Sequence, residues 1–388
     1  MNKYDFDQII PRENTGSVKY DGRKQVFGRE DVLPLWVADM DFATPDFIRQ
    51  AVIRRAHHPI YGYTLLSDAY FDAIIRWVKT RHRWDIQKDW ISFSPGIVPA
   101  INFAVLSYTQ PGDGVIVQPP VYFPFFEAIQ SNGRRQLNNP LRYVNGKYQI
   151  DFNDLEDKAK SARMLLLSHP HNPVGRSWTR RELETIGEIC LRHRVVIVSD
   201  EIHNDLMLPG NRHIPLATVS EEMAQNSVTC IAPSKTFNMA GLATSSVIIP
   251  NTDLRKAFRK TLDRLHIFRG NFFGYEASTA GYRHGAAWVD ALMDYVKGNF
   301  DLLSDFLQNE LPALRLTPAE ATYLAWIDFR DTGLSDAQIK DKLIHDAGLG
   351  FNHGPIFGEG GQGFQRMNLA APRSIIQEAC RRLQKTFS

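Results

Sequence analysis

The chain is poor in cysteine and has no long apolar run. Its 388 residues include three cysteines, Cys190, Cys230 and Cys380, which are odd in number and far apart. This pattern argues against a disulfide framework and favours a reducing compartment. No apolar stretch approaches the roughly 20 residues that a membrane-spanning helix needs, and residues 1–7 lack the apolar core of a signal peptide. We therefore expect a cytoplasmic protein with no membrane partner.

An excess of one charge sign is also missing. The chain has 45 basic and 43 acidic residues, a formal net charge of +2, and no long block of either sign. A nucleic acid or an anionic membrane would favour a strongly basic surface, so neither is expected as a partner. The pairs His57/His58 and His169/His171 have no carboxylate or cysteine at ligand spacing, so we expect no metal site.

What the chain does have is a sizeable apolar fraction arranged in short runs. Hydrophobic residues make up 43% of the sequence, and its length suggests two or three domains. Between about residues 90 and 250, apolar runs alternate with helical patterns, the runs being 90–93, 115–118, 164–167, 195–198, 228–231 and 246–249. This alternation predicts an α/β fold with a parallel or mostly parallel sheet covered by helices on both faces.

Shorter patterns predict local structure. Residues 1–47 show no sustained period and predict an irregular arm, in which Thr44 is expected to cap a helix that begins at Pro45. Thr179 and Glu182 form a capping-box pattern at the start of another predicted helix. Residues 321–329 alternate as a strand does, and residues 352–363 are expected to form a loop.

Polar residues follow the ends of these runs. Tyr122, Asn172, Asp200, His203 and Lys235 each come shortly after a predicted strand. Ligands of open α/β sheets bind outside the carboxyl ends of the strands. We therefore expect these five side chains to share one site.

Lys235 is the most informative of the five. It lies in a small, glycine-containing turn between two buried strands, where a lysine adds little to solubility but can form an imine with an aldehyde. We interpret Lys235 as the residue that carries pyridoxal phosphate as a Schiff base. An ordinary loop lysine is the alternative, which Asp200 and Asn172 in the same predicted site disfavour. The turn at 94–96, before a predicted helix, suits the cofactor phosphate, although a plain strand–helix turn explains it equally well.

Several motifs together resemble fold-type-I pyridoxal-phosphate enzymes of the class I/II aminotransferase superfamily, and more narrowly the MalY/PatB group of cystathionine β-lyases. They are WVADMDF at 36–42, HPIYGY at 58–63, HPHNPVG at 169–175, SDEIH at 199–203, SKTFN at 234–238 and RMN at 366–368. The resemblance implies an N-terminal arm (1–47) that joins a small C-terminal α+β domain (286–388), and a large cofactor-binding domain (48–285) with a mostly parallel seven-stranded sheet. It also implies a homodimer with active sites near the interface.

The resemblance assigns roles to individual residues. It implies that Lys235 is both Schiff-base lysine and catalytic base, although a free lysine has a pKa of about 10.4 and its pKa must be lowered for that role. Asp200 would pair with the pyridine nitrogen. Further cofactor contacts are implied for Asn172 and His203 at the phenolic oxygen, Tyr122 on the ring, and Ser234, Gly96, Ile97 and a partner subunit's tyrosine at the phosphate.

The substrate side of the site is implied in the same way. Arg366 would bind the α-carboxylate through a bidentate contact, with Trp36, Val37, Tyr122 and Asn172 as further substrate contacts. Tyr61 is expected as the tyrosine that reaches the phosphate, with Tyr63 left open. The chain also departs from the pattern, because Ala243 stands where many superfamily members carry a phosphate-binding arginine.

The reaction implied is β-elimination from L-cystathionine or a related cysteine S-conjugate, giving a thiol, pyruvate and ammonia. An aminotransferase is the alternative, because it uses the same cofactor and the same carbanion. His203 favours the lyase group, since related aminotransferases have tyrosine there. A regulatory binding protein with secondary catalysis is the third hypothesis, which a large exposed apolar patch away from the active cleft would favour.

Overall fold

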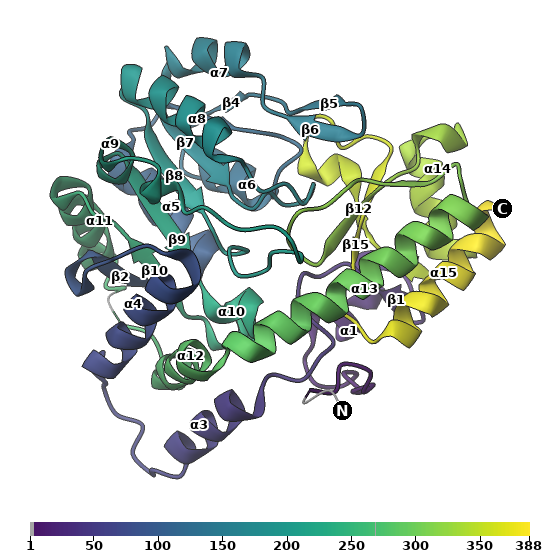
Figure 1. The fold of residues 1–388 in the computed structure, drawn as a ribbon, viewed down its shortest axis with the longest axis horizontal. Coiled ribbons are helices and arrows are strands. Elements are labelled where there is room, and N and C mark those ends of the chain that lie inside the picture. The colour runs from purple at the N-terminus through teal and green to yellow at the C-terminus, as the bar shows by residue number, and fades with distance from the viewer. Residues whose placement is uncertain (1–3, 268) are drawn as a thin grey trace.

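The computed structural model describes residues 4–267 and 269–388 and is built around a seven-stranded sheet (Figure 1). The strands, in spatial order, are β2 (Ile91–Ser94), β10 (Ser245–Ile248), β9 (Ser227–Ile231), β8 (Val196–Asp200), β7 (Ala162–Ser168), β3 (Gly114–Val117) and β4 (Arg135–Asn138). Only β10 runs antiparallel to its neighbours, and the pairs from β9 to β4 are parallel. The predicted mostly parallel sheet is therefore confirmed.

Helices cover both faces of this sheet. Along β7 the side chains alternate: Met164 and Leu166 pack with residues of α5 (Ile97–Tyr108) and α11 (Thr252–Arg264), whereas Leu165 and Leu167 pack with residues of α7 (Phe152–Ala159) and α8 (Arg180–Arg192). Successive side chains of a strand point to opposite faces, so a strand that helices cover on both faces needs apolar residues at every position. Three more helices, α4 (Asp68–His82), α6 (Pro124–Gln130) and α12 (Phe272–His284), complete the layers together with the short α9 (Glu221–Gln225).

The C-terminal part carries a second sheet, which is antiparallel. Its strands are β11 (Arg315–Leu316), β12 (Leu324–Asp328), β15 (Phe364–Asn368) and β14 (Asn352–His353), in that order. The long helix α13 (Ala286–Glu310) packs beside α15 (Arg373–Phe387), and α14 (Asp336–Asp341) lies at the same end (Figure 1). A small hairpin of β5 (Arg142–Val144) and β6 (Lys147–Gln149) lies above the large sheet.

The N-terminal arm joins the C-terminal part through a short parallel pair. Strand β1 (Leu33–Pro34) pairs with β13 (Leu349–Gly350), so residues more than 300 positions apart lie side by side (Figure 1). The mixed composition of the arm predicts irregular structure throughout. This is wrong in part, because the arm contains α1 (Val18–Asp21) and α2 (Arg23–Phe27). The domain boundaries after residues 47 and 285 stay a prediction.

Local capping was predicted with mixed success. Thr179 and Glu182 form the predicted capping box of α8. The helix α3 (Asp46–Ala56) begins one residue later than predicted, with Pro45 at its N-cap. The hydroxyl of Thr44 instead donates to the main-chain carbonyl of Asn238 at 2.8 Å, so the tertiary contact replaces the expected cap.

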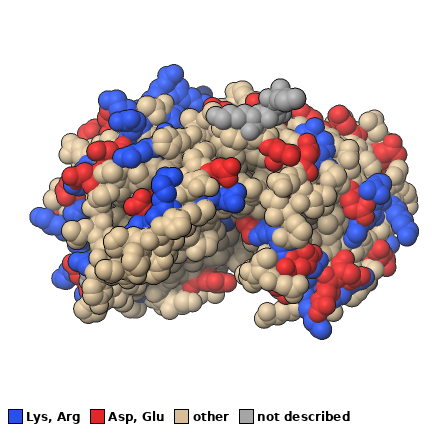
Figure 2. All heavy atoms as spheres, turned by 90° about the horizontal axis from the view of Figure 1, so that it is seen from below, with Lys and Arg blue, Asp and Glu red and all other residues tan. Residues whose placement is uncertain are grey.

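The surface of the molecule carries both charge signs, intermixed. Figure 2 looks onto the side from which α3 projects and shows no continuous field of one sign there. Within residues 4–267 and 269–388, no helix is long and apolar enough to cross a membrane.

Candidate functional site

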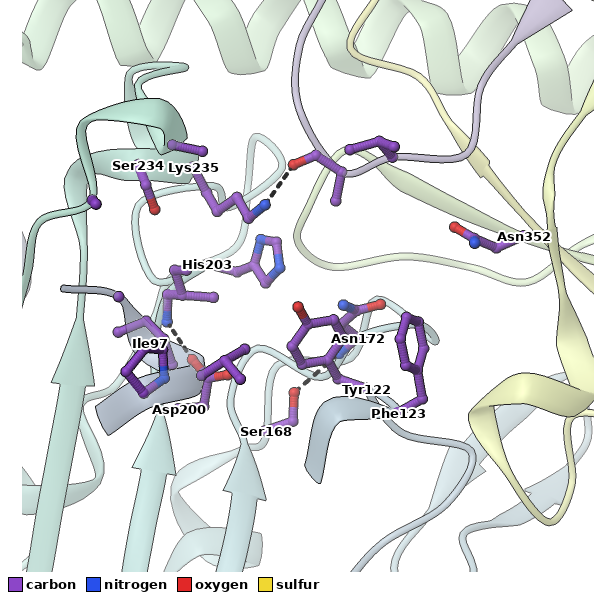
Figure 3. Close-up of a pocket in the computed structure, with 18 of the residues that line it drawn as sticks. Ile97, Tyr122, Phe123, Ser168, Asn172, Asp200, His203, Ser234, Lys235 and Asn352 are labelled. Carbon is purple, nitrogen blue, oxygen red and sulfur yellow. Dashed lines mark hydrogen bonds between the residues drawn. The ribbon is translucent and has the colours of Figure 1, made fainter. Parts of the chain in front are cut away.

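A cavity of about 340 Å³ lies at the carboxyl ends of the parallel strands. All the predicted site residues except Tyr61 line it, namely Trp36, Val37, Gly96, Ile97, Tyr122, Asn172, Asp200, His203, Ser234, Lys235 and Arg366. They come from the arm, from the ends of β7 and β8, from α5 and from β15, and Figure 3 shows how several of them converge. The structure thus brings together residues that are spread over more than 300 positions of sequence.

Asp200 is the last residue of β8 and is 5% exposed. Its carboxylate accepts a hydrogen bond from the main-chain N–H of Ile202 at 3.1 Å. Within the described part of the chain it forms no ion pair, and burial raises the pKa of Asp200 to about 7. The carboxyl group is therefore an acceptor that lacks a cationic partner.

Lys235 enters the cavity from α10 (Pro233–Thr236), a single helical turn where a Gly-containing loop was expected. Pro233 at the first helical position fits such a start, because its missing N–H is not needed there. The Lys235 Nζ donates to the main-chain carbonyl of Ala38 at 2.7 Å (Figure 3). Burial lowers the pKa of Lys235 to about 8, against the attraction of Asp39. The amine can therefore lose its proton much closer to neutral pH than an exposed lysine can.

Arg366 lies on β15 and is 3% exposed. Its guanidinium donates to Asn172 Oδ1 and to the Trp36 carbonyl, both at 2.9 Å, and to Asn352 Oδ1. Its Nε has no hydrogen-bond partner among the residues that the structure describes. Burial lowers the pKa of Arg366 to about 10, so the group stays cationic at neutral pH. A buried cation held only by neutral oxygens, with one donor unused, can accept an anionic ligand.

His203 and Tyr122 lie between these charged groups. His203 lies in a turn after β8, its Nδ1 has no partner, and burial next to Lys235 lowers its pKa to about 3, so its ring is neutral. Burial raises the pKa of Tyr122 to about 12, so its hydroxyl stays protonated. The Tyr122 ring lies beside Asn172 in Figure 3. Both aromatic groups are therefore uncharged.

The remaining end of the cavity is formed by the start of α5 and by Ser234. Gly96 is the N-cap of α5, and no side chain caps this helix, which leaves its first N–H groups available for an anion. Ala243, which stands where many superfamily members carry an arginine, lines the cavity. The cations among the lining residues are Lys235 and Arg366. Neutral donors therefore dominate this end within the described chain.

Tyr61 does not reach the cavity of its own chain. It lies in the extended segment after α3, is 58% exposed, donates to the Ala56 carbonyl at 2.9 Å and packs on Phe272 and Phe273. Tyr63 is fully exposed.

Some groups at the site were missed from the sequence. Tyr323 donates to the Ala38 carbonyl at 2.8 Å, and Asn352 supports Arg366. Tyr323 was part of a predicted strand, but the partner of its hydroxyl is 285 residues away, and no local pattern encodes such a contact. Asn352 opens the predicted loop at 352–363, and no local pattern links that loop to Arg366.

The pair His169/His171 has structural partners. His169 and His171 bond through Nε2 to the main-chain carbonyls of Ile214 and Pro120, both at 2.9 Å. Among the described residues, no group of three or more histidine, cysteine or carboxylate side chains could hold a metal ion.

The comparisons with known proteins agree with this geometry. The sequence profile of the family described as Aminotransferase class I and II matches residues 30–383. "Cystathionine beta-lyase PatB" of Bacillus subtilis is 44% identical over 99% of this chain and 100% of its own length. "Protein MalY" of Escherichia coli is 31% identical over 97% of this chain and 96% of its own.

Solved structures extend this similarity to the fold. The crystal structure of cystalysin from Treponema denticola, which contains a pyridoxal 5′-phosphate cofactor, superposes with a TM-score of 0.96 at 40% identity, over 99% of this chain and 98% of that one. The C-S lyase from Staphylococcus hominis, described as PLP-bound, gives a TM-score of 0.92 at 32% identity, over 99% and 98% of the two chains. The chain therefore belongs to the aminotransferase class I and II family.

Proposed function

We propose that the protein is a pyridoxal-phosphate-dependent carbon–sulfur β-lyase that cleaves L-cystathionine or a related cysteine S-conjugate. The observation that carries the proposal is a half-buried lysine, Lys235, and a buried carboxylate without an ion pair, Asp200, at one cavity of a chain that is 44% identical to a cystathionine β-lyase over its whole length. The three buried free cysteines also support the expected reducing, cytoplasmic setting.

The cavity residues fit the cofactor through their unused polar groups. The Asp200 carboxylate lacks a cation, which a protonated pyridine nitrogen would supply, and His203 Nδ1 lacks a partner, which a phenolic oxygen would supply. Asn172 would share that oxygen, and Tyr122 would lie on the ring. Ser234 and the N–H groups at the Gly96–Ile97 turn would hold the phosphate.

When bound, pyridoxal phosphate supplies an aldehyde for the substrate amine and a cationic ring that stabilises negative charge at the substrate Cα. Lys235 Nζ would hold that aldehyde and, after exchange for the substrate amine, would take the Cα proton. Burial has lowered its pKa to about 8, which brings the amine close to the working pH of a general base. The Asp200 carboxylate would hold a protonated ring nitrogen.

Arg366 orients the substrate for this proton transfer. Its guanidinium would bind the α-carboxylate, with Asn172 and the Trp36–Val37 stretch closing the same side of the cavity. After the Cα proton moves to Lys235, the Cβ–S bond breaks and both electrons leave with the sulfur as a thiolate. The remaining three-carbon enamine takes up water and yields pyruvate and ammonia, so cystathionine and water give homocysteine, pyruvate and ammonia.

An aminotransferase is the second candidate, favoured by the family description that covers residues 30–383. The two reactions share every residue named above and differ in whether the leaving group departs before a proton returns. Purified protein incubated with cystathionine and no keto acid separates them. We expect stoichiometric pyruvate and free thiol; turnover only after addition of a keto acid would contradict the lyase.

We further propose a homodimer with its active sites near the interface. The extended segment after α3 exposes several apolar side chains, Ile60, Tyr61, Tyr63 and Leu65, at 58% or more, and it projects from the molecule below α12 in Figure 1. A second copy would cover them and bring Tyr61 or Tyr63 to the phosphate end, where this chain offers neutral donors. Light scattering should give a mass near twice 44.2 kDa, and a monomer would contradict the proposal.

A further inference from the structure

Four consecutive main-chain carbonyls of the arm, those of residues 36–39, all accept hydrogen bonds from side chains around the cavity. Arg366 donates to the Trp36 carbonyl at 2.9 Å, and Asn368 Nδ2 donates to those of Val37 and Asp39 at 2.7 and 2.6 Å. The Tyr323 hydroxyl donates to the Ala38 carbonyl at 2.8 Å. We call residues 36–39 the carbonyl segment. Side chains of the C-terminal part thus fix it at every peptide.

The Ala38 carbonyl has a second donor, the Lys235 amine, at 2.7 Å. Tyr323 and Asn368, which fix this carbonyl and its two neighbours, are both fully buried. Neither side chain is among the residues that line the cavity. They act on Lys235 through the backbone of the carbonyl segment.

We propose that the Ala38 carbonyl is the hydrogen-bond acceptor that holds the Lys235 amine whenever that amine is free, and we call this acceptor the seat. Tyr323 and Asn368 are positioning residues that hold the seat in place. The inference rests on the proposed function only in taking Lys235 as the reacting amine. The seat itself is a property of the cofactor-free chain.

The seat matters because the net effect of the other surroundings opposes a charged amine. Burial and the Arg366 cation lower the pKa of Lys235, whereas Asp39 and Asp200 raise it. His203 is neutral, and Tyr323 is protonated because burial raises its pKa far above the usual value. A carbonyl oxygen binds an ammonium more strongly than a neutral amine, so the Ala38 oxygen favours the protonated form.

For the proposed reaction, the seat gives the proton taken from the substrate a fixed place. A buried ammonium without an acceptor would be costly. With Ala38 held at 2.7 Å from Nζ, Lys235 can keep that proton while the thiolate departs. A displaced carbonyl would leave the ammonium less stable and lower its pKa further.

The test uses Tyr323→Phe, which removes the hydroxyl and keeps the ring, in the cofactor-free protein. A brief pulse of formaldehyde and cyanoborohydride methylates neutral amines, and mass spectrometry gives the methylated fraction at Lys235 as a function of pH. The exposed Lys260 serves as an internal reference for the reagent. The matched control is Tyr148→Phe, another fully buried tyrosine, whose hydroxyl accepts from Trp326 Nε1 at 2.9 Å, away from the carbonyl segment.

In Tyr323→Phe we expect the labelling midpoint of Lys235 to fall by about one pH unit, the effect of a weakened hydrogen bond to a charged group. Tyr148→Phe should keep the wild-type midpoint. An unchanged midpoint in Tyr323→Phe would overturn the proposal, and so would a higher one, because the hydroxyl would then only compete for the carbonyl.

Asn368→Ser provides a second variant should Tyr323→Phe not fold, since it removes the donors to the carbonyls on both sides of Ala38. Its midpoint should also fall, and a wild-type midpoint would count against the seat. None of these readings depends on turnover. If the protein proved not to be a lyase, the pyruvate assay would fail while this titration kept its outcome.

Discussion

Two clusters of largely buried charge meet where Ala38, which binds Lys235 of one cluster, adjoins Asp39 of the other, and they differ in how the charges are partnered. In the arm cluster, defined as Arg12, Lys19, Asp39 and Asp41, every charge faces an opposite one. Lys19 is fully buried, with its Nζ 2.7 Å from Asp41, and Arg12 lies 2.7 Å from both Asp39 and Asp41. These contacts hold Arg12 and Lys19 against residues 39–41.

In the cavity, the charges of Lys235, Asp200 and Arg366 form no such pairs among the described residues. Lys235 is bound to a carbonyl, Asp200 to a main-chain N–H, and Arg366 to neutral oxygens. Burying a charge without an opposite partner is unfavourable, and the pKa values of Asp200 and Lys235 shift toward the neutral forms accordingly. Paired charges thus hold the arm, and unpaired charges mark the place where a charged ligand belongs.

The lysines of the two clusters give the sharpest form of this comparison. Lys235→Ala should abolish the imine absorbance with pyridoxal phosphate and lower the rate of pyruvate release at least about a hundredfold, because both carbonyl capture and proton transfer are lost. Lys19→Met should keep the imine absorbance at saturating cofactor, since Lys19 Nζ bonds to Asp39 and Asp41 and does not line the cavity. An imine band that persists in Lys235→Ala would mean that another lysine holds the cofactor.

A substitution in the arm cluster should lower the free energy of unfolding, whereas a substitution in the cavity should lower the reaction rate. Asp41→Asn leaves the fully buried Lys19 with Asp39 at 3.8 Å as its nearest carboxylate, and we expect a loss of about 3 kcal/mol in the free energy of unfolding. Denaturant titration measures it. The matched control is Asp46→Asn, whose pair with Arg49 is exposed and should contribute less than about 1 kcal/mol. Equal losses in both variants would contradict the distinction.

The sequence predicts the parts of this contrast that depend on neighbouring residues and misses those that depend on residues far apart in the chain. Asp200 and Asn172 were predicted at the site because each ends an apolar run, a local pattern that strand geometry turns into a shared edge. That Asp39 is paired while Asp200 is not could not be predicted. Ion pairs depend on which side chains meet after folding, and Arg12 reaches Asp39 across 27 positions.

The same limit explains the errors in local structure. The arm has a mixed composition without a clear period, so its helices α1 and α2 were missed; tertiary packing of Phe27 against Trp36 helps to hold α2. The role expected for Tyr61 came from the resemblance and stays a prediction, because Tyr61 does not line the cavity of its own chain.

A conservative change of the third cavity charge tests whether shape matters beyond charge. Arg366→Lys keeps the cation but loses the planar fork that serves Asn172 and the Trp36 carbonyl at once. We expect KM for cystathionine to rise about tenfold, the effect of one lost hydrogen bond to a charged group, while the imine absorbance stays unchanged. A loss in kcat alone would place Arg366 in the chemical step instead of substrate binding.

The smallest expected effect is a pH dependence of stability, and it tests the absence of a partner for Asp200 directly. Burial raises the pKa of Asp200 to about 7 in the folded chain, whereas an unfolded aspartate titrates near about 3.9. The folded state thus binds this proton more tightly, so the group's contribution to stability falls as pH rises from about 4 to about 7. Asn does not titrate. Between pH values of about 5.5 and 6.5, the stability of cofactor-free Asp200→Asn relative to wild type should therefore rise by about 1 kcal/mol.

Urea titration of the cofactor-free proteins at several pH values measures this difference, with Asp46→Asn as the exposed control. A flat difference for Asp200→Asn would mean that the carboxylate finds a cation without any ligand, and the contrast between the two clusters would fail. Saturating the wild-type protein with pyridoxal phosphate should remove the slope, because a cationic ring nitrogen would then favour the ionised carboxylate in the folded state. A slope that persists with bound cofactor would mean that Asp200 does not contact a cationic ring nitrogen, and the assignment of the cofactor site would then depend on Lys235.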